Sequence, residues 1–434
     1  MLGAITGFSQ PVVKHPNQTE SLQKKFDWVS TEKLPKGFWV GYSIQVKMKE
    51  NSNFFFGKWD SQQSKYYSTL ESIISGNPQP ATTQKELLKK EIERALEEND
   101  DEDSEANPES EKIVDKDYGI LFHFYDDKVD FNEVDEIAAV VMNKGIDFDK
   151  DPIYWLGKSD LNQSVDFLVS KYKGKSSDKT KENLMGLIGI HKNSEKVIPF
   201  YKKVLDENGD TKIGKSALFW IAQQDKPESL DIIKSVLKRD NLSEIWDDAV
   251  FGLSQMKMKE AESFLFDLAG NSKERDVKKK ALFWIGQKST DAAAKLLKDV
   301  VYNDSSDEIQ KEAVFGISQL KKDKGTEILF EIAEKHPESE IRKQAIFWLS
   351  QKAGQKVIKF ISNVAYNDRD IEIKKQAVFA LAQLDKNEGF DELVKLAKDH
   401  PSGQIRKEAI FWLSQKDDKR ALDAIKDILK SEEN

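Results

Sequence analysis

The side chains best suited to acid–base or metal chemistry are five histidines, and none has a partner at a recognised spacing. No His-Glu-x-x-His motif or similar metal-binding pair accompanies His15, His123, His191, His336 or His400. The chain has no cysteine, which excludes disulfides and thiolate metal sites. It also lacks a nucleophile elbow, a phosphate-binding loop and a dinucleotide fingerprint. We therefore assign no catalytic, cofactor-binding or metal-binding residue, and we expect a protein that is not an enzyme.

One short segment imitates a calcium-binding loop. Four residues fit loop positions 1, 3, 5 and 8, namely Asp206, Asn208, Asp210 and Ile213. However, Thr211 stands where the sharp turn requires glycine, and Ala217 stands where a bidentate glutamate would complete the site. The segment therefore does not predict a calcium site.

The elements that would position any site are set by an 11-residue phrase that returns every 32 residues. Its clearest copy runs from Ile341 to Gln351 as IRKQAIFWLSQ, and it is one of seven copies that succeed one another without insertion between Ile213 and Gln415. A period of this length is typical of a solenoid of stacked supersecondary units. Apolar residues at helical spacing predict one helix for the phrase and a second helix after it in each unit. Weaker copies extend the array to residues 150–434, with eight or nine units.

Three columns of the phrase have both a packing and a ligand interpretation. Counting from Trp348 as position 0, this column alternates between large and small residues: Trp220, Gly252, Trp284, Gly316, Trp348, Ala380 and Trp412. We expect each indole to fill the space beside a small residue on the next helix, so that Trp348→Ala costs ~3 to 5 kcal/mol. The alternative is a row of exposed aromatic platforms.

Glutamine occupies position +3 in all seven copies, and several first helices carry basic groups near their start, namely Lys278-Lys279-Lys280, Arg342-Lys343, Lys374-Lys375 and Arg406-Lys407. We expect the amides to satisfy helix-end carbonyls, rather than to bind a polar ligand. We expect the basic residues to pair with acids at helical spacing, rather than to line an anionic groove. The loops before the first helices also alternate, with His336-Pro337 in one unit and Tyr302-Asn303-Asp304 in another. These loops are the first place to look for a ligand surface.

The phrase resembles the HEAT-repeat family, specifically bacterial HEAT-like and phycobilisome-lyase-type repeats. The features that carry the resemblance are the β-branched residue, the basic residue, the alanine and the closing Leu-x-Gln of copies such as IRKEAIFWLSQ. Over residues 150–434 it implies a right-handed α-solenoid of 32-residue helical hairpins. The family consists mostly of binding scaffolds, which implies a protein or peptide partner on the concave face. The His-Glu metal motifs of HEAT-like hydroxylases are absent from this sequence.

Residues 20–84 and 117–148 predict a small β-rich domain before the array. Phe38–Met48 alternates as a strand does, Phe54–Trp59 reads as its hairpin partner, and Tyr118–Tyr125 reads as a further strand. Phe131–Asn143 reads as a helix that leads into the repeats. The alternative to a scaffold is an enzyme, or an accessory to one, with a site between this sheet and the first irregular repeats. Tyr118–Tyr125 and His191 would lie closest to such a site.

Charge and hydropathy narrow the classes of partner. Residues 85–116 hold 13 acidic and six basic side chains, so this acidic and partly disordered insertion carries −7 of the net charge of −9. The remaining chain is near neutral, which makes nucleic acid an unlikely partner. No apolar run is long enough for a transmembrane helix. Residues 1–10, MLGAITGFSQ, read as the remnant of a signal peptide, which favours a periplasmic or secreted location over a cytoplasmic one.

Overall fold

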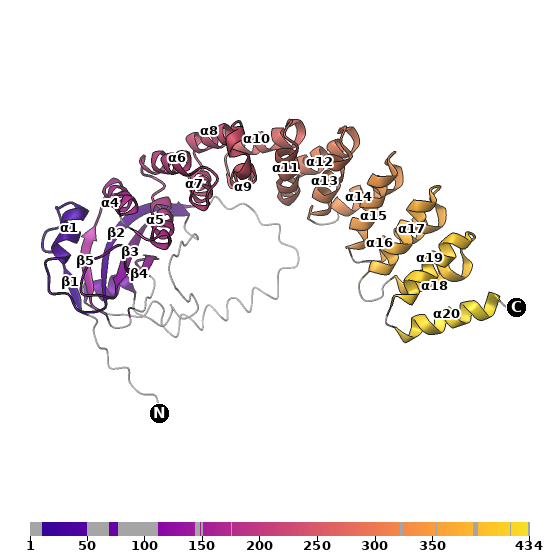
Figure 1. Ribbon diagram of the computed structural model, residues 1–434, viewed down its shortest axis with the longest axis horizontal. Coiled ribbons are helices and arrows are strands. Elements are labelled where there is room, and N and C mark those ends of the chain that lie inside the picture. Colours follow the sequence, from indigo (N-terminus) through magenta and orange to yellow (C-terminus); the bar gives the residue numbers. More distant parts are fainter. Residues whose placement is uncertain are drawn as a thin grey trace, which may run out of the picture. The chain divides into compact units, whose positions relative to one another are not determined.

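The computed structural model divides into two compact units, residues 1–238 and 239–434. The residues that the structure describes are 11–49, 69–76, 112–143, 148, 151–174, 176–321, 324–352, 354–384, 389–416 and 418–432. The first unit contains a sheet with helices, and the second contains only helices (Figure 1). The predicted strand Phe54–Trp59, residues 1–10 and most of the acidic insertion lie outside the described residues.

The sheet of the first unit has five strands in the order β1-β5-β2-β3-β4. They are β1 (Val12–Lys14), β2 (Phe38–Lys49), β3 (Ile113–Phe124), β4 (Val134–Val141) and β5 (Ile153–Lys158). The long strands β2 and β3 pair antiparallel from Phe38 opposite Phe124 to Lys49 opposite Ile113. β5 runs parallel to both β1 and β2. A small N-terminal sheet therefore forms, as predicted, and β2 covers the strand that we predict at Phe38–Met48.

Two segments that were predicted to be helical are strands. Residues 134–141 of the predicted helix Phe131–Asn143 form β4, and residues 153–156, which we assigned to the first weak repeat, form part of β5. Both strands contain runs that are buried on both faces, such as Ile137–Val141. A continuous apolar run lacks the alternation that marks a half-buried strand, so its periodicity does not separate strand from helix. β3 also begins at Ile113, inside the predicted insertion 85–116.

Helices cover the sheet and continue the first unit. They are α1 (Leu22–Val29), α2 (Leu70–Ser75), α4 (Leu161–Lys173), α5 (Asp178–Gly189), α6 (Val197–Asn208), α7 (Lys212–Gln223) and α8 (Pro227–Val236). Asp160, Ser177 and Thr211 accept backbone N–H bonds as the N-caps of α4, α5 and α7. Phe26 of α1 stacks on Phe167 of α4 at 4.3 Å, and this pair joins both helices to the aromatic residues of the sheet.

The second unit is a solenoid of alternating helices. Its first helices, which carry the repeated phrase, are α9 (Trp246–Gln255), α11 (Arg275–Lys288), α13 (Asp307–Ser318), α15 (Ser339–Ser350), α17 (Ile371–Gln383) and α19 (Gly403–Ser414). Its second helices are α10 (Lys259–Asn271), α12 (Asp291–Asn303), α14 (Lys324–Lys335), α16 (Gln355–Asn367), α18 (Phe390–Asp399) and α20 (Lys419–Glu432), and the 3-10 helix η2 (Asp240–Ile245) precedes them. None of the described helices is long and apolar enough to cross a membrane.

Successive first helices pack on one another and form a continuous layer, which we call the first-helix layer. The alanines at position −3 make this close approach feasible, and those of the second unit are fully buried. Each second helix packs most closely on the first helix that follows it, as α14 does on α15. The closely packed helical pair therefore consists of the second helix of one sequence repeat and the first helix of the next. The 32-residue period does not predict this pairing, because it does not specify which neighbouring first helix a second helix prefers.

Candidate functional site

The histidine expected near an enzyme site belongs to an enclosed hydrogen-bond chain in the first unit. His191 Nδ1 lies 2.8 Å from the carbonyl oxygen of Leu187, which can only accept, so Nδ1 carries the proton of the neutral ring. Nε2 then accepts from the hydroxyl of Ser164 at 2.8 Å, and Ser164 accepts from the hydroxyl of Tyr42 at 2.8 Å. The chain Tyr42–Ser164–His191 thus connects β2, α4 and the residues after α5.

All three of these side chains are completely buried. Burial lowers the pKa of His191 to about 4 and raises the pKa of Tyr42, so both groups are neutral at pH 7. A serine beside a histidine is the arrangement of an activated nucleophile. Here, however, the hydroxyl and the imidazole are enclosed on every side and already hydrogen-bonded. In this conformation the group joins helices to the sheet and offers no reacting atom to a substrate.

The segment Tyr118–Tyr125 contains a separate histidine cluster. His123 lies between two carboxylates, with Nε2 2.8 Å from Asp151 and Nδ1 3.4 Å from Asp135. Trp39 of β2 packs on the imidazole with ring centroids 4.7 Å apart. His123 and His191 therefore have different partners, and the structure gives no shared cluster of these two expected residues.

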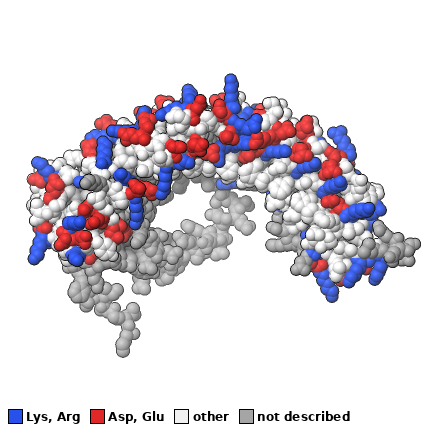
Figure 2. All heavy atoms as spheres, in the orientation of Figure 1, with Lys and Arg blue, Asp and Glu red and all other residues white. Residues whose placement is uncertain are grey.

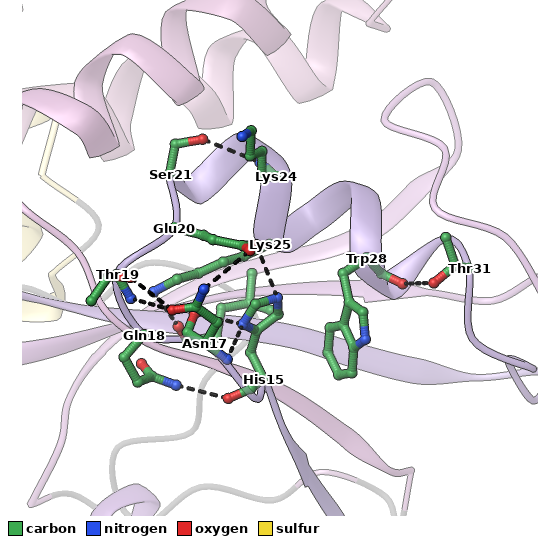
Figure 3. Close-up of polar contacts among 11 residues, drawn as sticks. His15, Asn17, Gln18, Thr19, Glu20, Ser21, Lys24, Lys25, Trp28 and Thr31 are labelled. Atoms are coloured by element: carbon green, nitrogen blue, oxygen red, sulfur yellow. Dashed lines mark hydrogen bonds and ion pairs between the residues drawn. The ribbon is translucent and has the colours of Figure 1, made fainter.

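His15 holds the first strand to helix α1 (Figure 3). Its ring packs edge-on against Trp28 at 4.7 Å, and Nδ1 accepts the backbone N–H of Asn17 at 3.1 Å. Beside it, Lys25 is almost completely buried and donates to the carbonyl oxygen of Leu156 in β5 at 3.0 Å. Burial lowers the pKa of Lys25, and the charge of Glu20 opposes that shift. These bonds tie β1, α1 and β5 together.

The calcium-like segment is a helix-to-helix turn. Asp206 pairs with Lys202 one turn earlier in α6 at 2.6 Å, and Asn208 donates to the carbonyl oxygen of Val204 at 2.7 Å. Thr211 caps α7. The side chains of Asp206 and Asn208 therefore interact with the last turns of α6, and that of Thr211 interacts with the start of α7. Across the part of the chain that the structure describes, no three His, Asp or Glu side chains come together to hold a metal.

His336 and His400 of the alternating loops are buried against tyrosines of the preceding repeat. His336 packs on Tyr302 with ring centroids 5.0 Å apart, and its Nε2 lies 3.1 Å from the carbonyl oxygen of Val301. Sixty-four residues later, His400 packs on Tyr366 in the same way at 5.3 Å. Arg342 then donates from the following helix to the carbonyl oxygen of His336 at 3.0 Å. The expectation of a ligand surface is therefore wrong for His336 and His400, which are buried, whereas Tyr302 is half-buried and Asn303 is exposed.

The basic residues of the first helices have partners within the solenoid. At position −6, Arg342, Lys374 and Arg406 reach back to carbonyl oxygens of the preceding loop. At position −5, Lys343 and Lys375 pair with glutamates three residues earlier at 2.9 and 2.8 Å. Both arrangements agree with a structural role for these charges rather than with a phosphate-binding track.

The tryptophans at position 0 are half-buried, and they pack on the preceding first helix. Trp284, Trp348 and Trp412 contact Phe251, Phe315 and Phe379 at 4.8–5.1 Å between ring centroids. In the first unit, Trp220 covers Gly189 of α5, a glycine at position +1 rather than one of the small residues of the position-0 column. In the second unit, Gly316 is instead covered by Leu297 and by the backbone of α11.

We accordingly expect Trp348→Ala to cost about 2 kcal/mol, less than the value expected for a fully buried indole. The indole Nε1 is buried without a hydrogen-bond partner, so its removal also relieves an unfavourable group. Trp348→Phe keeps a ring on Phe315 and should lose much less. Urea denaturation of the three proteins measures the difference, and equal losses for both variants would show that the ring contact is not the stabilising element.

Four of the glutamines at position +3 end their first helices through a preceding serine, whereas Gln223, Gln287 and Gln383 follow alanine or glycine. Gln351 donates to Ser350 Oγ at 3.2 Å, and Ser350 donates to the carbonyl oxygen of Phe347 at 2.6 Å. The same pair of bonds occurs at Gln255, Gln319 and Gln415. The amides that follow a serine thus satisfy helix-end carbonyls indirectly, and each has a second N–H and a carbonyl oxygen for other partners, as at Gln319, whose oxygen accepts from Gln287 at 3.5 Å.

Sequence reasoning missed the phenylalanine at position −1, which is present in all seven copies. In the second unit these residues are Phe251, Phe283, Phe315, Phe347, Phe379 and Phe411. A helix turns 100° per residue, so position −1 lies about 160° from the buried positions −3 and +1. This angle was the available signal that the column faces away from the core. None of the six is buried, and Phe411 is 52% exposed.

These phenylalanines and the tryptophans form an aromatic ladder on the first-helix layer. Phe251 contacts Trp284, Phe283 stacks on Phe315 at 5.9 Å, and Phe315 contacts Trp348. Position −5 and position +3 lie one turn before and after each phenylalanine on the same helix face. Lysine occupies position −5 from α11 to α19, and glutamine occupies position +3 throughout. The exposed strip of these helices therefore reads Lys, Phe, Gln in each repeat.

Residues 326–403, which include part of this ladder, match the family model of HEAT repeats. These units are HEAT repeats. No curated protein matches the chain. Solved structures with a similar fold include human deoxyhypusine hydroxylase in complex with glycerol (13% identity, 61% of this chain and 97% of that chain, TM-score 0.26). Others are a Kap121p mutant (12%, 62% and 39%, TM-score 0.36) and the CpcE–CpcF complex of phycocyanin lyase from Nostoc sp. PCC7120 (15%, 62% and 94%, TM-score 0.25). Similarities at this level carry no argument about function.

The aromatic ladder contains a recess of about 360 Å³ between α11, α13 and α15. Phe315 and Trp348 form its apolar wall, and Lys279, Lys311 and Glu312 form its polar rim. Burial raises the pKa of Glu312, although the charges of Lys279 and Lys280 oppose the shift. A larger cavity of about 520 Å³ lies on the other layer, between α10 and α12.

Charges of both signs alternate along the solenoid (Figure 2). Lys279 pairs with Glu308 on the next first helix, and Lys280 pairs with Asp247 on the previous one at 2.8 Å. The rim of the ladder is consequently close to neutral, and its apolar centre is the chemically distinctive part of the surface.

Proposed function

We propose that this protein is a non-catalytic scaffold that binds a protein or peptide along the aromatic ladder of its HEAT repeats. The observation that carries the proposal is the half-exposed phenylalanine at position −1 of every first helix in the second unit. The fold does not need an aromatic residue there, because the position faces away from the second helices. Contiguous apolar surface with a polar rim is typical of interaction sites, and aromatic residues are enriched in them.

The neutral rim supports a protein partner over a polyanion. A nucleic-acid-binding surface needs cations that are available to phosphates. On this surface Lys279, Lys343 and Lys375 already pair with glutamates. The enzyme alternative has no comparable support, since the Ser164–His191 pair is fully enclosed.

Site-specific crosslinking tests the proposal. Benzoylphenylalanine is placed at position 347 in the ladder and, as a matched control, at position 360 in α16. Phe360 packs on Phe330 in the second helices, at 4.5 Å between ring centroids. Irradiation in the native cells should give a defined crosslinked protein from position 347 that is absent from position 360. Crosslinking from position 360 alone, or from neither position, would contradict the proposal.

A further inference from the structure

The ladder has a repeat distance that restricts the conformation of a bound partner. Each first helix presents one row, which we define as the residues at positions −5, −1 and +3 of that helix. Packed helices lie about 8–10 Å apart, so successive rows recur at about that distance. An extended chain rises about 3.1–3.3 Å per residue and therefore advances about one row every three residues. A helix with a rise of 1.5 Å per residue advances about one row every six residues.

The glutamine of each row distinguishes between an extended ligand and a helical ligand. Gln351 and Gln319 each use one N–H on the neighbouring serine, and each amide has a second N–H besides. The carbonyl oxygen of Gln319 accepts from the amide of Gln287 in the previous row at 3.5 Å, so these two amides lie side by side along one edge. An extended chain displays its own N–H and C=O groups to such an edge, whereas a helix uses them internally. The amides therefore favour an extended ligand.

The remaining positions of the row define the side chains of that ligand. Phe315 and Trp348 offer an apolar recess large enough for an aliphatic or aromatic side chain. The paired lysines and glutamates of the rim, such as Lys343 with Glu340, offer no excess charge to attract an acidic or basic segment. A ligand that fits is apolar at every third residue and carries little net charge.

We infer that the HEAT repeats of the second unit bind an extended polypeptide segment of low net charge, with an apolar side chain at every third residue in register with the aromatic ladder. The inference rests on the proposed function and specifies the ligand class of the same surface. The segment runs across the first helices, its apolar side chains lie against the phenylalanines, and its backbone bonds to the glutamine amides.

Selection from a displayed library of random 15-residue peptides on the full chain tests this inference. Peptides are counted as ladder-dependent when they bind the wild type and the control Phe360→Ser but not the double variant Phe315→Ser/Phe347→Ser. We expect these peptides to share apolar residues at a period of three and to tolerate proline between them. Fluorescence anisotropy should show binding at least about tenfold weaker for Gln319→Leu/Gln351→Leu, because two amide bonds are lost.

The outcomes separate the inference from the proposed function. Ladder-dependent peptides with apolar residues at i, i+3, i+4 and i+7, which proline abolishes, would overturn the extended ligand and retain the binding surface. Ladder-dependent binding that Gln319→Leu/Gln351→Leu leaves unchanged would also overturn the inference. Failure to obtain any ladder-dependent peptide would count against both. Circular dichroism of each variant confirms that the solenoid is folded before binding is compared.

Discussion

Gly286→Ala is expected to destabilise the second unit by about 3 kcal/mol. A Cβ at this position of α11 would lie 2.5 Å from the carbonyl oxygen and 2.9 Å from the Cα of Gly316 in α13. Both atoms belong to backbone, which cannot rotate away as the end of a side chain can. The two helices would have to separate, and the stack of Phe283 on Phe315 would separate with them.

Gly270→Ala provides a matched control on α10. There the added Cβ would meet only the Cδ1 of Leu296 at 3.6 Å, an ordinary contact. Alanine also has a higher helix propensity than glycine, so this variant should be neutral or more stable by about 0.5 kcal/mol. Urea denaturation followed by circular dichroism, with hydrogen exchange of α11 and α13, measures both effects. Equal stability of the two variants would be incompatible with backbone contact between α11 and α13.

The repeat register is the part of this fold that the sequence predicts well. Stacked units impose the same packing environment every 32 residues, so buried columns such as the alanines at position −3 recur without drift. The first helix against which a given second helix packs is harder to predict, because the apolar stripe of a second helix suits either of the two neighbouring first helices. The strands β4 and β5 were misread for a related reason. A run of apolar residues that is buried on both faces has no hydrophobic alternation, so its pattern does not distinguish a strand from a helix.

The surface was predicted less well than the core, and the phenylalanine column shows why. Phenylalanine recurs beside position 0 in all seven copies, and this column went unrecognised although its helical angle places it away from the buried positions −3 and +1. Conversely, His336 and His400 were read as surface loops because proline follows them, yet Tyr302 and Tyr366 bury them. Burial of a loop residue depends on the neighbouring unit, and a single unit's sequence does not show that contact.

Acid is expected to weaken the first unit through His191. The imidazole has a pKa of about 4 in the folded protein, against an ordinary value of 6.5, because burial disfavours its charged form. Between these two pH values the unfolded chain binds a proton that the folded chain does not. Unfolding is therefore favoured as the pH falls through this window, and about 3 kcal/mol of stability present above pH 6.5 is lost by pH 4.

The variant His191→Gln isolates this contribution from that of the carboxylates. Glutamine occupies the equivalent position in all seven copies of the phrase, and it does not titrate. At pH 7 the variant should be less stable than the wild type, since the bonds to Ser164 and Leu187 change. Below pH 6.5 the difference in unfolding free energy should shrink steadily and then reverse, because only the wild type must bury an imidazole that the unfolded chain protonates. A difference that stays constant from pH 7 to pH 4.5 would mean that His191 keeps an ordinary pKa, and that the chain from Tyr42 to His191 is open to water.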